Sequence, residues 1–491
     1  VVAGGNNPPE LAANDQFADP GVNSAIANGT INNATTNVTL QATNNVTFTA
    51  PIAMVNPGLG LTVEAGNNIT FQGFVIPFLG STPGVLTNGG DVNLRAGGDV
   101  VIDRFAIRTD SLEGAAAGDI TITTGPTGRL LLQNRGILTA DTRGAGTAGT
   151  ITIQGGTVDV LTPVGTRNLS GISANTTGSG SAGKIAIAAN RLAVDGAVIQ
   201  AFTNGPGDAG EITVQANEIA VTGQGRLGGI DGGLFANSNT SLAGTGKAGA
   251  ITLEAQRLSV RDGAGIYANS ISANPGGRVT VRAADIEVSG QGLRPSSVSV
   301  GAPAAFGARG DGGTMQLVAD RLTIRNGAIV EASALNGQGG TVNVQANTVN
   351  VLDGGNLGAD GRNGGQLTVE TGQLRVQNGS FISVGTLAGN AGGLVQIRAR
   401  DRVEVLDSSG ISADAFGGQG GNVLVETQDF RLQNLSTVSA GTFGRGVAGN
   451  VSVRGSNSVL VDRSFLGLSS LGTVTGGSLS IATGNLTVQN G

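Results

Sequence analysis

The chain has no cysteine, no histidine and no tryptophan among its 491 residues, and aromatic residues make up only 3% of it. Without histidine it lacks a Ser-His-Asp triad, and without cysteine it lacks thiol nucleophiles, thiolate metal sites and disulfides. Haem ligands are equally scarce, since Tyr267, Met54 and Met315 are the remaining side chains of the usual axial types. We therefore predict no metal, no cofactor and no enzymatic activity.

Basic residues and long apolar runs are also rare. Lysine occurs only as Lys184 and Lys247, and the formal net charge is −6. Binding to nucleic acid depends on basic side chains that neutralise phosphates, so we predict no nucleic-acid partner. No apolar run approaches the roughly 18 residues that a membrane-spanning helix needs, and we predict that the chain does not span a membrane.

Glycine, in contrast, is abundant, with 85 residues. One glycine opens a short alternating run about every 28 residues, and the last four spacings are each 28 residues. A repeat of this length indicates a solenoid, a propeller or an array. The anchor glycines are Gly60, Gly90, Gly118, Gly149, Gly183, Gly210, Gly249, Gly277, Gly313, Gly340, Gly365, Gly393, Gly421, Gly449 and Gly477.

Each repeat holds three short runs of alternating apolar and polar residues, separated by glycine or asparagine. The run after Gly421 is followed by a second run, an Asn or Asp corner and a third run, and the repeat closes with a glycine-rich loop. Period-2 alternation predicts β-strands, and a propeller blade needs four strands in a longer unit. We predict an all-β, right-handed parallel β-helix (β-solenoid) over 37–491, with three short strands per coil and roughly 16 coils. Residues 1–36 are predicted to be a loop-rich extension.

Two positions in the repeat form regular series. The fourth residue after the start of the second run is polar in successive repeats, which predicts a column of stacked polar side chains. We interpret this column as a structural ladder: Asn326, Asp353, Asn378, Asp407, Asn434, Arg463 and Asn490. Asn amides can hydrogen-bond along such a column, and Asp never occupies adjacent coils, where carboxylates would repel. A plain turn preference explains the residue types as well. Carboxylates two coils apart, roughly 10 Å, cannot share a small ion.

The second series is apolar and lies five residues after the apolar residue of the third run (Ile382, Ile411, Val438 or Leu466): Leu387, Phe416, Phe443 and Leu471. One interpretation is a small cluster packed under the glycine loops. The other is an exposed apolar stripe for self-association or ligand contact, because contiguous exposed patches usually mark binding surfaces.

The repeats resemble those of cyanobacterial large exoproteins, which are similar to filamentous haemagglutinins secreted by two-partner systems. The resemblance is carried by segments such as 374–383, LRVQNGSFIS, and 446–451, GVAGNV, and it covers roughly 37–491. It implies a right-handed β-helix that acts as an adhesin or fibre outside the cell, on the surface of a Gram-negative-type bacterium. It also implies surface polysaccharide or other cells as partners.

We therefore expect a non-catalytic, extracellular structural or adhesive protein, whose copies stack head to tail with residues 1–36 helping the junction. The alternative is a polysaccharide-processing enzyme on a β-helix scaffold. Such enzymes work with carboxylates and basic side chains, and glycoside hydrolysis needs two acids roughly 5 to 10 Å apart. Most of the 34 acidic residues stand alone within their repeats, which favours the non-catalytic interpretation.

Overall fold

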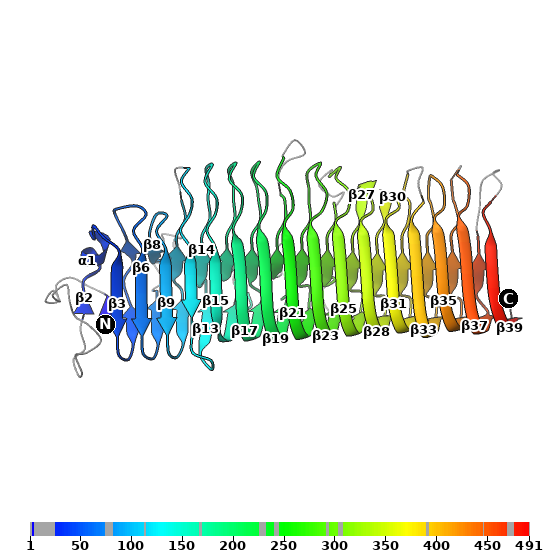
Figure 1. Ribbon diagram of the computed structural model, residues 1–491, viewed down its shortest axis with the longest axis horizontal. Coiled ribbons are helices and arrows are strands. Elements are labelled where there is room, and N and C mark those ends of the chain that lie inside the picture. The colour runs from blue at the N-terminus through cyan, green and yellow to red at the C-terminus, as the bar shows by residue number, and fades with distance from the viewer. Residues whose placement is uncertain are drawn as a thin grey trace. The chain divides into compact units, whose positions relative to one another are not determined.

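The structure, a computed structural model, describes residues 2–3, 25–73, 82–111, 114–165, 169–224, 232–239, 245–290, 294–302, 308–388, 392–444, 446–468 and 476–490. The chain forms two compact units. Unit 1 comprises Val1–Gln224 and Ile230–Ala236, and unit 2 comprises Gly225–Gly229 and Asn237–Gly491. Within each unit the strands of successive coils lie side by side, as the labels from β31 to β37 show for unit 2 (Figure 1).

The predicted parallel β-solenoid is confirmed. The coils are about 28 residues long and make about 14 turns, rather than the 16 predicted. Every pairing between successive coils in either unit is parallel, for example Val423 with Val451 and Val451 with Leu479, as the repeat alignment predicts.

The described residues of unit 1 form one short helix, α1 (Asn28–Asn32), and two sets of strands. The strands of its long-strand sheet are β1 (Val2–Ala3), β2 (Ala25–Ile26), β3 (Val38–Ala42), β4 (Val46–Phe48), β6 (Leu61–Ala65), β7 (Ile69–Gln72), β9 (Val92–Ala96), β10 (Val100–Asp103), β12 (Ile120–Thr123), β13 (Arg129–Gln133), β15 (Ile151–Leu161), β17 (Lys184–Asp195) and β19 (Glu211–Thr222). Those of the short-strand sheet are β5 (Ile52–Ala53), β8 (Gly84–Leu86), β11 (Ala106–Arg108), β14 (Ile137–Thr139), β16 (Gly171–Ser173), β18 (Val198–Gln200) and β20 (Gly233–Phe235).

Unit 2 repeats the same two sets. Its long strands are β21 (Ala250–Arg261), β23 (Arg278–Ser289), β25 (Thr314–Arg325), β28 (Thr341–Leu352), β31 (Gln366–Gln377), β33 (Leu394–Leu406), β35 (Asn422–Gln433), β37 (Asn450–Asp462) and β39 (Leu479–Gln489). Its short strands are β22 (Gly265–Tyr267), β24 (Ser297–Ser299), β26 (Ile329–Glu331), β29 (Asn356–Gly358), β32 (Phe381–Ser383), β34 (Gly410–Ser412), β36 (Thr437–Ser439) and β38 (Phe465–Gly467). A further pair, β27 (Ala334–Gln338) and β30 (Gly361–Asn363), lies at the start of the closing loops.

The prediction of three short strands per coil is correct only for the early coils. From β15 onward, the first two runs merge into one strand of 11 to 13 residues that bends midway. In the early coils, glycines such as Gly97 and Gly98 separate β9 from β10. In later coils such as β17, only Asn190 lies between the paired residues Ala189 and Arg191, so the pairing resumes directly after the bend.

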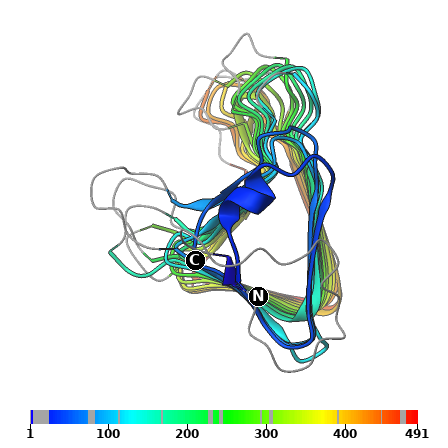
Figure 2. The same cartoon turned by 90° about the vertical axis from the view of Figure 1, so that its left-hand side faces the viewer.

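The anchor glycines mark the closest approach of successive coils. A methyl group on Gly421 would lie 2.2 Å from the carbonyl oxygen of Gly393, and one on Gly277 would lie 2.0 Å from that of Gly249. Both distances are far below van der Waals contact. The repeated glycine therefore serves backbone packing between coils. Seen along the stack, the coils of unit 2 trace a three-sided outline, and the closing loops project as a lobe from one corner (Figure 2).

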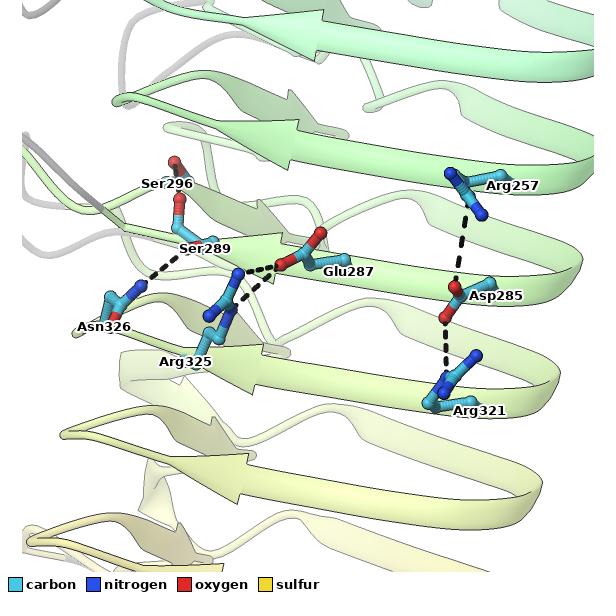
Figure 3. Close-up of polar contacts among 8 residues, drawn as sticks. All are labelled: Arg257, Asp285, Glu287, Ser289, Ser296, Arg321, Arg325 and Asn326. Carbon is cyan, nitrogen blue, oxygen red and sulfur yellow. Dashed lines mark hydrogen bonds and ion pairs between the residues drawn. The ribbon is translucent and has the colours of Figure 1, made fainter.

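The outer faces of the long strands carry columns of alternating charge. Asp285 on β23 lies between Arg257 on β21 and Arg321 on β25, with nitrogen–oxygen distances of 4.0 and 3.2 Å (Figure 3). The carboxylate of Glu287 likewise accepts a hydrogen bond from the guanidinium group of Arg325 in the next coil, at 2.6 Å. Exposed ion pairs contribute little stability each. A shift of one strand along its neighbour would separate these opposite charges, so the columns favour one register between strands.

The described part of residues 1–36 packs against the chain's own first coils. Strand β1 pairs in parallel with both β2 and β4, and the α1 residue Ile31 is buried. In unit 2, β39 pairs with β37, and Leu479, Leu486 and Val488 on β39 are exposed although they continue buried columns of β37.

Candidate functional site

The corner after most long strands of unit 2 has a left-handed backbone. The φ angles of the predicted ladder residues lie between 47° and 59°, at Asn326, Asp353, Asn378, Asp407, Asn434, Arg463 and Asn490. Asn and Asp tolerate this conformation better than other non-glycine residues. The corner conformation therefore accounts for the residue types in the series.

Within this column, side chains of neighbouring coils form hydrogen bonds with one another. Asn378 donates to Asp353 at 2.8 Å, Asn434 donates to Asp407 at 2.8 Å, and Arg463 donates to Asn434 at 3.1 Å. At the two ends of the column, the hydrogen-bond acceptors are residues outside it: Asn326 donates to Ser289, and Asn490 donates to Asp462. Hydrogen bonds from Asn434 and Gln377 lower the pKa of the exposed Asp407 carboxyl. Each carboxylate in the column thus has an amide donor in a neighbouring coil.

An added carboxylate at this corner is expected to destabilise unit 2. In Asn378→Asp, the side chain would lie between Asp353 and Asp407 and would lose the amide that now donates to Asp353. We expect a loss of about 1–2 kcal/mol at low ionic strength, reduced by salt because the site is exposed. Urea unfolding at low and at high NaCl concentration measures this loss of unfolding free energy. The control Asn378→Gly keeps the left-handed backbone without the charge, and an equal, salt-independent loss in both variants would contradict the repulsion.

The short strands and the residues after them present a second face, here called the third-strand face. Side chains alternate along it, so Ala413 and Ala415 are fully buried while Ser412, Asp414 and Phe416 point outward. In five successive coils of unit 2, the outward positions form three rows. The inner row is Glu331, Gly358, Ser383, Ser412 and Ser439; the middle row is Ser333, Asp360, Gly385, Asp414 and Gly441; the outer row is Leu335, Arg362, Leu387, Phe416 and Phe443.

The two acids of the middle row bond their coils to the next ones. Asp414 accepts from the backbone N–H of Gly441 and, at 2.6 Å, from the hydroxyl of Ser439. Asp360 accepts in the same way from the N–H of Gly385 and the hydroxyl of Ser383. The sequence analysis missed this position. The signal was present in the recurring tripeptide at 412–414, SAD, and at 173–175, SAN.

The same position in unit 1 holds Asp141, whose carboxyl group has a raised pKa. Burial raises the pKa of Asp141 to about 6, and the nearby carboxylate of Asp110 adds to the rise. In unit 2, burial likewise raises the pKa of Glu331 and of Asp360, and the Asp360 charge raises that of Glu331 further. Glu331 and Asp360 lie in neighbouring coils, which places two carboxyl groups of raised pKa on the third-strand face.

Replacing Asp141 with asparagine is expected to stabilise unit 1 at neutral pH. The folded-state pKa of about 6 exceeds the reference value of 3.8, so the folded chain binds this proton more tightly. Stability therefore falls as the pH rises between these values and stays lowered above them. We expect Asp141→Asn to add on the order of 2 kcal/mol at pH 7 and little at pH 3. Thermal unfolding across pH measures this, and an equal gain at both pH values would contradict it.

The outer row contains most of the predicted apolar stripe. Leu387, Phe416 and Phe443 lie in successive coils, because Phe416 donates its backbone N–H to Thr386 and Phe443 donates to Ala415. Phe416 is 62% exposed and Phe443 is 43% exposed, and their ring centroids are 5.6 Å apart. Leu471 lies outside the described residues.

Comparison with known proteins found no matching protein family, no matching curated protein and no matching solved structure. No helix in the described ranges is long and apolar enough to cross a membrane. Among the same residues, no group of three or more acidic side chains is placed to hold a metal ion.

Proposed function

We propose that the chain is a non-catalytic structural and adhesive protein of the bacterial cell exterior. The observation that carries this proposal is the third-strand face, which combines a coil-to-coil bonded framework with exposed aromatic side chains in its outer row. Exposed apolar patches on an otherwise well-packed protein usually mark binding surfaces. The resemblance of the repeats to large exoproteins supports a location on the surface of a Gram-negative-type bacterium.

An adhesion assay tests this function. The purified chain is immobilised, and we expect it to retain bacterial cells and polysaccharide-coated beads more than an equally acidic control protein does. Retention equal to the control on every surface would contradict an adhesive role. Head-to-tail stacking of copies stays a prediction, and electron microscopy of the purified chain distinguishes single particles from continuous filaments.

A second candidate function, cleavage of a polysaccharide, is favoured by the pair Glu331 and Asp360. An acid of raised pKa beside a second carboxyl group is the arrangement that glycoside hydrolysis requires. However, the Asp360 carboxylate already accepts hydrogen bonds from the Ser383 hydroxyl and the Gly385 N–H, as part of the contact between coils. Release of reducing ends from a glycan, lost in Glu331→Gln, would establish the enzymatic function instead.

A further inference from the structure

We infer that the third-strand face of unit 2 binds a linear, neutral polysaccharide, with the rings of Phe416 and Phe443 against its sugar residues. This inference rests on the proposed adhesive function and names the ligand class and the site. The two rings are tilted by 30° and are both substantially exposed. A pyranose ring has apolar C–H faces and a rim of hydroxyl groups. It can therefore cover an aromatic side chain while its hydroxyls reach polar neighbours.

Those polar neighbours lie in the adjacent rows. Beside Phe416 and Phe443 the middle row offers Asp414, and the inner row offers Ser412. The two oxygens of Asp414 each accept one bond within the protein, from Ser439 and from Gly441. An ionised carboxylate has about four acceptor positions, so Asp414 retains capacity for ligand hydroxyls.

The charge of the face selects a neutral ligand. Arg362 is the one basic residue in the three rows, whereas Glu331, Asp360 and Asp414 are acidic. An anionic polysaccharide, a nucleic acid or an anionic membrane surface would meet more negative than positive charge here. Neutral sugars avoid this repulsion, and their hydroxyls can donate to the carboxylates.

The dimensions of the outer row argue for a linear ligand. The row is one residue wide and extends over five coils, which is about 19 Å at the usual strand spacing. A stable protein dimer buries roughly 800 Å² on each partner, which a single row of side chains does not supply. A glycan chain lying along the stack would meet one outer-row side chain at each coil, roughly every 4.8 Å, and an extended pyranose residue is of similar length.

Affinity electrophoresis of the full chain tests the inference. The gels contain hydroxyethyl cellulose, galactomannan or dextran, with dextran sulfate as the anionic comparison. We expect at least one neutral glycan to retard the wild type. The double variant Phe416→Ala/Phe443→Ala should bind it roughly tenfold more weakly, while Phe416→Tyr, which keeps a ring, and Leu435→Ala, an exposed apolar control at another corner, should bind like the wild type. Circular dichroism checks that each variant is folded.

Several results would overturn the inference. They are retardation by dextran sulfate alone, retardation by none of the glycans, or unchanged retardation of the double variant. Sedimentation that shows a wild-type dimer lost in the double variant would assign the row to self-association instead. The adhesion assay separates the two proposals. If the double variant still retains cells, the glycan site is wrong and the adhesive function stands, whereas a wild type that retains nothing contradicts the function itself.

Discussion

Alanine at Gly421 is expected to lower the free energy of unfolding of unit 2 by roughly 3 kcal/mol, through overpacking. The added methyl group would lie 2.2 Å from the carbonyl oxygen of Gly393, 2.7 Å from its backbone nitrogen and 2.9 Å from the Cβ of Ala413. Neither backbone atom can move without displacing a coil, because Gly421 also donates its N–H to Ala413 and Asn422 donates to Gly393. The strain must therefore open the contact between the two coils.

A matched control separates this packing effect from the general cost of replacing glycine. Gly379 has no atom within 4 Å of the added methyl position, but its φ is +69°. Gly379→Ala should therefore cost only roughly 1 kcal/mol, for the left-handed backbone. Urea unfolding followed by circular dichroism compares the two variants, and equal losses would show that contact between coils does not explain the anchor glycines.

The anchor glycines illustrate what the sequence predicts and what it leaves out. Their period of about 28 residues predicts the parallel stacking and the register, including Val423 beside Val451. The period alone does not reveal the short distance between Gly421 and Gly393, because that distance depends on where the coil bends. The same limit explains the merged long strands. Ala189 and Asn190 look like a turn in the sequence, but Ala189 and Arg191, on either side of Asn190, both pair with the next coil, so the strand continues.

The candidate site, like the fold, could be predicted only in part from the sequence. The corner column was visible as a series of Asn and Asp, but its pairing was not, and Asn490 bonds to Asp462 instead of to its predicted column neighbour. The middle row was missed although the tripeptide at 412–414 recurs in similar form at 173–175, because the donor to Asp414 is the backbone N–H of Gly441, one coil away. The outer row was recognised from Phe416 and Phe443, since apolar residues at loop positions are conspicuous in a glycine-rich repeat.

The last prediction concerns the aromatic stack inside the first coils of unit 1. Phe71 lies between Phe48 and Phe105, with ring centroids 4.4 and 5.4 Å away, and all three rings are fully buried. Phe71→Ala would remove the middle ring, leave a cavity and end both ring contacts. We expect a loss of roughly 3–5 kcal/mol. Phe71→Leu, which fills most of the volume, should lose clearly less, and the difference measures the contribution of the cavity.

The location of this loss is as informative as its size. In a solenoid each coil contacts only its neighbours, so stability is the sum of local terms. Hydrogen exchange in Phe71→Ala should therefore accelerate in β4, β7 and β10 and leave β31 to β37 of unit 2 unchanged. Phe430→Ala, an equally buried phenylalanine on β35, is the matched control and should give the reverse pattern. Faster exchange throughout both units in either variant would show that the chain unfolds as one cooperative block, and the nearest-neighbour description would then be wrong.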